Sequence, residues 1–149
     1  AEEFQGSLDM ISELRFDKVH CAAYSSRPGT TAHRTMEDDV SQEEKASRRV
    51  RADALQESIL REINAGLMGQ TVEVLVEGRQ KGKWHGRTRG NKLVFFEDAP
   101  GDWSEDGSGS EAVQPGDLVS LTISQATPWS LQGVPAAGAR RGKTATSVV

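Results

Sequence analysis

The sequence predicts an α+β protein in which helical segments precede a small antiparallel β-barrel. Two patterns in the spacing of apolar residues support this prediction. Up to residue 65 the apolar residues recur at every third or fourth position, as in helices that bury one face. From Gly69 onward they recur at every second position, as in half-buried strands. Four or five short strands in such a stretch are typical of a small barrel.

The composition fits one domain and excludes several kinds of site. The chain has 149 residues, 36% of them apolar, and a net charge of −4. Its lone cysteine, Cys21, excludes a disulfide framework, a Cys-rich zinc site and an iron–sulfur site built from this chain alone. No apolar run approaches the ~18–20 residues of a membrane helix, and no secretory signal opens the chain. We therefore expect a cytoplasmic protein without a membrane partner.

The first 40 residues predict a helix, a strand and a loop. Phe4, Leu8, Ile11 and Leu14 form an apolar stripe that predicts a helix over residues 1–16. The mostly apolar segment that follows, residues 17–24, is expected to be a buried strand, and residues 25–40 a loop. A helix followed by a buried strand is the repeating unit of α/β folds, and one unit cannot bury both its apolar faces. Since the chain also begins with Ala-Glu-Glu-Phe rather than Met, we expect a fragment.

A long helix is expected next, over residues 42–65. Ser41 followed by Glu44 fits a capping box, in which a hydroxyl and a carboxylate satisfy backbone N–H groups at the start of a helix. Gly66 is a plausible residue for its C-terminal end.

The second half predicts the strands of the barrel. Val72, Val74 and Val76 alternate with polar residues and indicate the first strand. Further strands are expected over residues 83–89, 91–97 and 118–126, with a short fifth one at residues 130–131. The acidic segment 98–117 is expected to be a flexible loop, and residues 134–149 a disordered tail.

A run of basic residues in the second expected strand is the most informative feature for function. Residues 79–92 hold six basic residues and no acidic one, in a chain of net charge −4. Since residues two apart share a face of a strand, Lys83, His85, Arg87 and Arg89 are expected to point together. The residues between them, Trp84, Gly86 and Thr88, would then face the core.

This row of cations favours binding to a phosphate backbone. The candidate RNA-binding residues are Lys81, Lys83, His85, Arg87, Arg89 and Lys92. Arginine offers planar pairs of donors to phosphate, and His85 is suited to stacking on a base. The alternative is a solvated sheet face on which lysines protect an edge.

The sequence contains no convincing catalytic or metal site. The three histidines are scattered without metal-ligand spacing. His20 and Cys21 are expected to be core residues of the strand at 17–24. The acidic residues around Asp38 are expected to complement the N-terminus of the following helix.

An ordered set of short segments resembles the C-terminal part of the MiaB-like tRNA methylthiotransferases. The segments lie at residues 16–20, 23–25, 27–30, 43–45, 73–78, 86–89, 91–96 and 126–133. The resemblance implies that residues 1–64 are the end of a radical-SAM partial (β/α) barrel, a helix–strand remnant followed by a linker helix. It implies that residues 65–128 are a TRAM domain, a small RNA-binding β-barrel.

The resemblance also implies a function, partners and cofactors for the complete enzyme. That enzyme attaches a methylthio group to the isopentenylated adenosine next to the tRNA anticodon, using two [4Fe-4S] clusters and S-adenosylmethionine. Its cluster cysteines lie in parts that this chain lacks, so the fragment alone is expected to be inactive. Its partners would be the tRNA anticodon arm and the missing N-terminal and radical-SAM domains. Tyr24 and Arg27 would lie on the substrate side of the catalytic domain.

Two alternatives remain open from the sequence. One is a stand-alone, non-enzymatic RNA-binding module, in which residues 1–64 are accessory. The other is a methylthiotransferase that acts on another substrate. The barrel is common to methylthiotransferases with different substrates, so it does not discriminate between those substrates.

Overall fold

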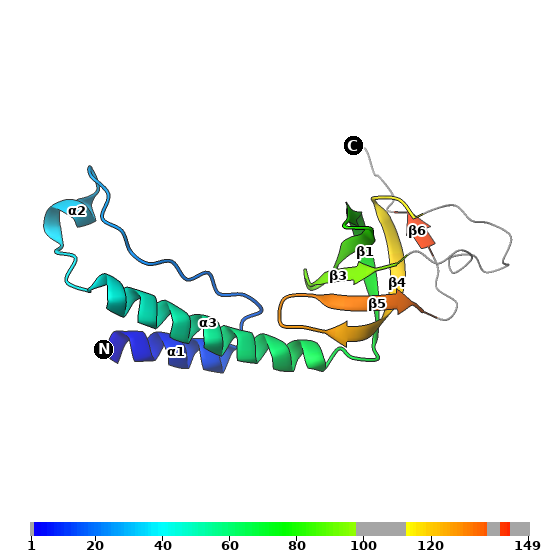
Figure 1. Ribbon diagram of the computed structural model, residues 1–149, viewed down its shortest axis with the longest axis horizontal. Helices are drawn as coiled ribbons and strands as arrows, with labels where there is room; N and C mark the ends of the chain where they lie inside the picture. The colour runs from blue at the N-terminus through cyan, green and yellow to red at the C-terminus, as the bar shows by residue number, and fades with distance from the viewer. Residues whose placement is uncertain (1, 98–112, 137–140, 144–149) are drawn as a thin grey trace, which may run out of the picture. The chain divides into compact units, whose positions relative to one another are not determined.

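A computed structural model describes residues 2–97, 113–136 and 141–143 of the chain (Figure 1). The chain divides into two compact units, residues 1–60 and residues 61–149. The division falls inside the long helix α3, which is described below with each unit in turn. The expected acidic loop at 98–117 lies mostly outside the described residues.

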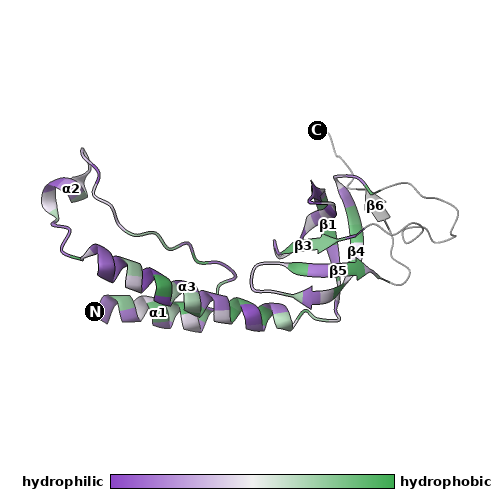
Figure 2. Ribbon diagram, viewed as in Figure 1, coloured by the Kyte–Doolittle hydropathy of each residue, from purple (hydrophilic) through white to green (hydrophobic). Residues whose placement is uncertain are grey.

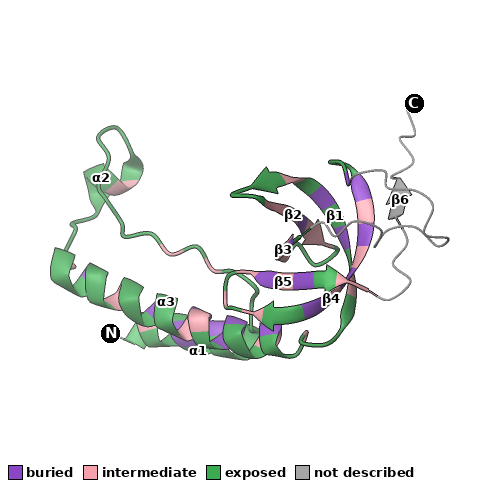
Figure 3. Cartoon of the chain, turned by 45° about the vertical axis from the view of Figure 1, so that its right-hand side comes forward, coloured by how far each residue is buried: buried purple, intermediate pink, exposed green. Residues whose placement is uncertain are grey.

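The first unit contains three helices, α1 (Glu2–Leu14), α2 (Thr31–Thr35) and α3 (Gln42–Ala65). The apolar stripe predicted for α1 is confirmed, because Leu8 and Ile11 are buried. On the α3 side the buried residues include Ala52 and Ile59. At the start of α1, the Phe4 ring centroid lies 5.0 Å from the guanidinium carbon of Arg51. These contacts hold the two helices side by side (Figure 3).

The predicted start of α3 is confirmed. Ser41 Oγ accepts a hydrogen bond from the Glu44 backbone N–H at 3.1 Å. The Glu44 carboxylate accepts from Arg48 Nε at 2.6 Å, one turn further along the helix. The hydroxyl half of the capping box is therefore present, and the carboxylate lies in an ion pair on the helix surface.

The expected strand at residues 17–24 is wrong. These residues have no regular secondary structure, His20 is exposed and Cys21 is only half-buried. A buried strand needs a neighbouring strand for its backbone N–H and C=O groups, and the described part of the first unit offers none. The expected loop at 25–40 also contains a short helix, α2, which Thr30 caps by accepting from the His33 backbone N–H at 3.2 Å.

The second unit is a β-barrel closed by five strands. They are β1 (Thr71–Gln80), β2 (Lys83–Thr88), β3 (Leu93–Phe96), β4 (Asp117–Ala126) and β5 (Leu131–Pro135). The strand order β1-β2-β3-β5-β4 closes through pairing of β1 with β4. A sixth short strand, β6 (Arg141–Lys143), pairs with the start of β4.

One pair of strands departs from the expected antiparallel pattern. β3 and β5 are parallel, with Val94 opposite Leu131. The reason is geometric, because strand direction cannot alternate all the way round a closed barrel with an odd number of strands.

The expected disordered tail is wrong at residues 134–135, which belong to β5, and at residues 141–143, which form β6. The rest of that tail, from residue 137 on, lies outside the described residues.

The barrel interior is filled from alternate positions of β1, β3 and β4 and by Leu131 of β5, as the spacing of apolar residues predicts. Figure 2 shows hydrophobic residues, in green, along these strands. Gly86 of β2 faces this interior, where β1 passes very close. A Cβ added at Gly86 would lie 2.2 Å from the Leu75 carbonyl oxygen. The buried core side chains are Val74, Val76, Val94, Phe96, Val113, Val119, Leu121, Ile123 and Leu131.

Among the described residues, no helix is both long enough and apolar enough to cross a membrane.

Candidate nucleic-acid interface

The outer face of β2 carries the expected row of side chains. Gly86 is buried and Trp84 packs against the core, so these two residues face inward. Lys83, His85 and Arg87 alternate with them and lie on the outside of the barrel, each partly exposed. Most of β2 is therefore neither fully buried nor fully exposed (Figure 3).

Two tight turns extend the row at both ends of β2. Lys81 lies in the turn between β1 and β2, with a φ of 50°, and is exposed. Arg89 lies in the turn after β2, where the Thr88 N–H donates to the Lys92 carbonyl at 3.0 Å. Because a strand rises ~3.3 Å per residue, Lys83 and Arg89 are about 20 Å apart along the row. The interface is named the β2 ridge and consists of Lys81, Lys83, His85, Arg87, Arg89 and Lys92.

Carboxylates on or next to neighbouring strands pair with three of these cations. Arg89 Nη2 lies 2.8 Å from Glu73 Oε2, and Arg89 Nε lies 3.0 Å from the same oxygen. Arg87 Nε lies 3.5 Å from Glu77 Oε2. Lys83 Nζ lies 3.1 Å from Glu97 Oε1. The sequence did not predict these three pairings, although Glu73 and Glu77 occupy polar positions of the alternating pattern in β1.

These ion pairs leave the cations accessible. The Arg89 side chain is 86% exposed, and those of Arg87 and Lys83 are 41% and 42% exposed. Exposed pairs of this kind contribute about 0–1 kcal/mol each, since water screens both charges. A phosphate group can therefore replace a carboxylate partner at low cost. The β2 ridge has five lysines and arginines, against the three carboxylates of Glu73, Glu77 and Glu97, so these residues together carry two more positive than negative charges.

A shallow hollow lies beside the ridge where β1, β2 and β4 meet. Its volume is about 220 Å³, and Arg87 and Arg89 form part of its wall. Leu75, which is 38% exposed, contributes an apolar surface between them. An apolar floor next to two guanidinium groups suits the sugar or base of a nucleotide whose phosphate binds the arginines.

His85 is the aromatic member of the ridge. Its ring centroid lies 6.2 Å from that of Phe95 on β3, with the planes tilted by 44°. Its Nδ1 atom is buried and has no hydrogen-bond partner among the described residues. Gly78 lies opposite His85, and a Cβ there would approach the imidazole Cε1 to 3.4 Å. The ring is thus held in place on one side and partly open to solvent on the other.

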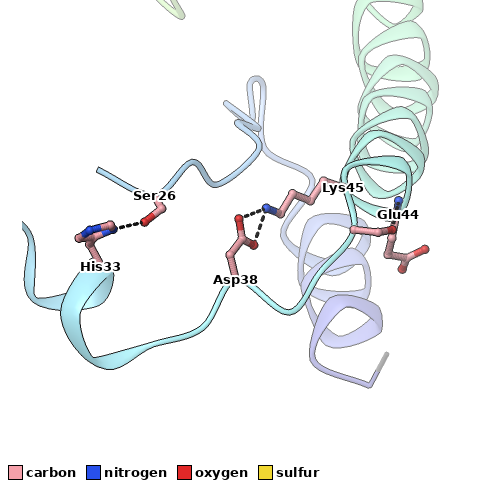
Figure 4. A network of polar contacts seen from close by, with 6 residues as sticks. Ser26, His33, Asp38, Glu44 and Lys45 are labelled. Carbon is pink, nitrogen blue, oxygen red and sulfur yellow. Dashed lines mark hydrogen bonds and ion pairs between the residues drawn. The ribbon is translucent and has the colours of Figure 1, made fainter. Parts of the chain in front are cut away.

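The first unit carries two of the predicted site residues, Tyr24 and Arg27, and they do not line the same cavity. Tyr24 is 49% exposed and lines a cavity of about 580 Å³, whereas Arg27 is exposed in a turn and is not part of that lining. Near this cavity, the buried Lys45 Nζ lies 2.6 Å from Asp38 Oδ2 (Figure 4). His33 is paired with Ser26 through Nδ1 at 2.7 Å.

Two acidic residues, one before α3 and one in its first turn, pair with cations of that helix. Asp38 pairs with Lys45 and Glu44 with Arg48. Across the described residues, no group of three histidine, cysteine or acidic side chains is arranged to hold a metal ion.

Comparison with known proteins matches the barrel to a domain family and most of the chain to part of a group of enzymes. The TRAM domain family matches residues 67–136, which include all five strands of the barrel. The tRNA-2-methylthio-N(6)-dimethylallyladenosine synthase of Roseiflexus sp. (strain RS-1) is 51% identical over 89% of this chain and 26% of its own length. The enzymes of the same name from Chloroflexus aurantiacus and Herpetosiphon aurantiacus are 47% and 48% identical over 90% and 89% of this chain, and 27% and 28% of their own lengths.

The chain therefore spans about a quarter of the length of these curated relatives. The identity extends well beyond the TRAM match, because it covers nine-tenths of the chain, including most of the helical unit. Residues 67–136 thus match the TRAM domain family, and nine-tenths of the chain is similar to part of the tRNA-2-methylthio-N(6)-dimethylallyladenosine synthases.

Proposed function

We propose that this chain is the RNA-binding part of a tRNA methylthiotransferase, and that its barrel binds the anticodon arm of the tRNA. The β2 ridge binds phosphates through its lysines and arginines, and His85 contacts a base or a sugar. The relatives are named as synthases of 2-methylthio-N(6)-dimethylallyladenosine in tRNA, which supports tRNA over another RNA as the partner. The barrel adds affinity for the tRNA, while the chemistry belongs to the rest of the enzyme.

The observation that carries the proposal is the placement of Lys83, His85 and Arg87 on one outer face of β2, with cationic turns at both ends. Their acidic partners are weak competitors for phosphate because all three pairs are exposed. The ridge runs for about 20 Å along the outside of the barrel, which fits a polymer better than a small ligand.

The catalytic cofactors proposed for the complete enzyme do not fit this chain. Each [4Fe-4S] cluster is held by several cysteine thiolates, and the chain has only Cys21. We therefore propose that the clusters and S-adenosylmethionine bind to other parts of the enzyme. This chain alone is expected to lack methylthiotransferase activity.

The helical unit is proposed to connect the barrel to those catalytic parts. Helix α3 runs without interruption from residue 42 to residue 65, and its first turn is capped by Ser41. A continuous capped helix is a stiff connection. Tyr24 and Arg27 remain proposed substrate-side residues of the catalytic domain.

The proposal is tested by removing two guanidinium groups from the ridge. In Arg87→Ala/Arg89→Ala, the affinity for an anticodon stem-loop RNA should fall, and the slope of log K against log salt should flatten by roughly 2, about 1 for each lost phosphate contact. Filter-binding titrations over a range of salt concentrations measure both quantities. Glu73→Gln should raise the affinity a few-fold, because it removes the carboxylate that competes for Arg89.

Arg49→Ala is the matched control. Arg49 is an exposed arginine paired with Asp53 at 3.5 Å, as Arg87 is with Glu77, but it lies on α3. Its removal should change the salt slope little. If the double variant binds with the same slope as the original chain, the β2 ridge does not bind the phosphates.

A further inference from the structure

Trp129 is exposed on a turn whose backbone is tightly fixed. Its side chain is 58% exposed, in the turn that joins β4 to β5. Thr127 Oγ1 donates to the Ser130 carbonyl at 2.8 Å and accepts from the Ser130 N–H at 3.0 Å. The Thr127 N–H also donates to the Ser130 carbonyl, at 2.9 Å. Pro128 restricts the backbone between them. The turn therefore presents a large aromatic ring to solvent from a rigid support.

The buried side chain of Asn64 fixes the backbone of this turn through two hydrogen bonds. Asn64, which is 4% exposed, lies at the end of α3 within the second unit. Its Nδ2 atom donates to the Thr127 carbonyl at 2.7 Å and to the Pro128 carbonyl at 3.0 Å. Both amide hydrogens are thus used to fix the two residues that precede Trp129. A turn whose backbone is already fixed loses less backbone entropy when a ligand binds to it.

The sheet register places this turn next to one of the two cationic turns that flank β2. β3 and β5 are adjacent and parallel, with Val94 opposite Leu131. The residues just before these two strands therefore lie at the same end, and they include Lys92 before β3 and Trp129 before β5. The turn that precedes β3 also carries Arg89. Because neighbouring strands are ~4.8 Å apart, the Trp129 turn is next to the turn that bears the cations.

We propose that Trp129 is a stacking platform for an unpaired base of the bound RNA, next to the phosphate-binding cations of the 88–92 turn. This inference rests on the proposed function and adds a base-binding position to it. An aromatic ring beside cations is the combination by which proteins hold single-stranded nucleic acid, since the ring stacks on a base while the cations bind the adjoining phosphates. An apolar protein surface fits less well, because covering Trp129 would also desolvate Arg89 and Lys92.

Tryptophan fluorescence and binding together test this inference. The chain has three tryptophans, at positions 84, 103 and 129. Titration of the 149-residue chain with an anticodon stem-loop RNA should quench part of the emission, and this quenching should persist in Trp103→Phe and be lost in Trp129→Phe. A blunt-ended RNA duplex of the same charge should quench much less, because it offers no unpaired base.

Binding measurements separate stacking from charge. Trp129→Ala should weaken binding to the stem-loop by about 5- to 150-fold, the range measured for loss of one aromatic–base stack. Its salt slope should stay that of the original chain, because no phosphate contact is lost. Trp129→Phe should restore most of the affinity. Val134→Ala, which shortens another exposed apolar side chain of β5, should bind normally.

The outcomes distinguish this inference from the function on which it rests. If the original chain fails to bind the stem-loop, the proposed function falls and the inference with it. If the chain binds but Trp129→Ala binds equally well and the emission is unchanged, the inference alone is overturned. The melting curve of Trp129→Ala should match that of the original chain, since the ring is mostly exposed.

Discussion

Gly86 lies at the point where β1 and β2 approach most closely, on the inner side of the β2 ridge. A Cβ at this position would lie 2.2 Å from Leu75 O and 2.8 Å from Val74 Cγ1. The obstacle at Leu75 is backbone, so the barrel itself would have to shift. Gly86→Ala should therefore lower the free energy of unfolding of the barrel by at least ~1–3 kcal/mol, the usual cost of overpacking a core. Thermal unfolding followed by near-ultraviolet circular dichroism measures this effect.

Gly6→Ala is the control for that substitution. Gly6 lies in α1 with nothing within 4 Å of an added Cβ, so alanine should be neutral or slightly stabilising there. A Gly86→Ala barrel as stable as the original would mean that the approach of β1 to β2 is looser than described.

Single residues also show how much of the candidate site the sequence reveals. The period of two is sufficient to assign Lys83 and Arg87 to one face of β2. It does not reveal Glu73 and Glu77 as neighbours of the ridge, because pairing across strands depends on register. A bulge between Val76 and Gly78 shifts the register of β1 against β2 at Glu77. Such a shift has no signature in the spacing of residues along one strand.

At the scale of elements, the start of α3 depends on one side chain. Ser41→Ala removes the hydroxyl that accepts from the Glu44 N–H and leaves that donor without its protein partner. The free energy of unfolding of the helical unit should fall by about 1 kcal/mol, the typical value of such a cap. Hydrogen exchange should be faster at the amides of the first turn of α3. Far-ultraviolet circular dichroism and hydrogen exchange together measure the change.

Ser58→Ala tests whether the effect is specific to the cap. Ser58 is exposed in the interior of α3, where alanine favours the helix slightly more than serine. This variant should leave the first turn unchanged. Equal losses in the two variants would show that Ser41 does not act as a cap.

The elements that the sequence predicts well are those whose signals are local. Helices α1 and α3 and strands β1 to β4 follow from apolar periodicity and from a capping residue. The segment 17–24 has strand-like composition but no strand to pair with, so composition misleads there. The parallel pairing of β3 with β5 is likewise not local, because it follows from closure of the barrel.

At the scale of the whole molecule, the two units have different relations to the proposed function. The barrel has its own closed core and carries every member of the β2 ridge. The helical unit carries Tyr24 and Arg27 on exposed coil, and the first of the relatives that the chain matches is roughly three and a half times as long as this chain. The proposed binding of RNA therefore belongs to the barrel, and the proposed chemistry belongs to parts of the enzyme beyond this chain.

The most direct test of this account is to map the RNA contact on the barrel by nuclear magnetic resonance. An isotope-labelled 149-residue chain is titrated with an anticodon stem-loop, and the amide shifts are followed residue by residue. The account predicts that the largest changes fall on residues 81–92 and on the turn around Trp129. Changes confined to the outer face of β4, at Ser120 and Thr122, or no changes in the barrel at all, would contradict it.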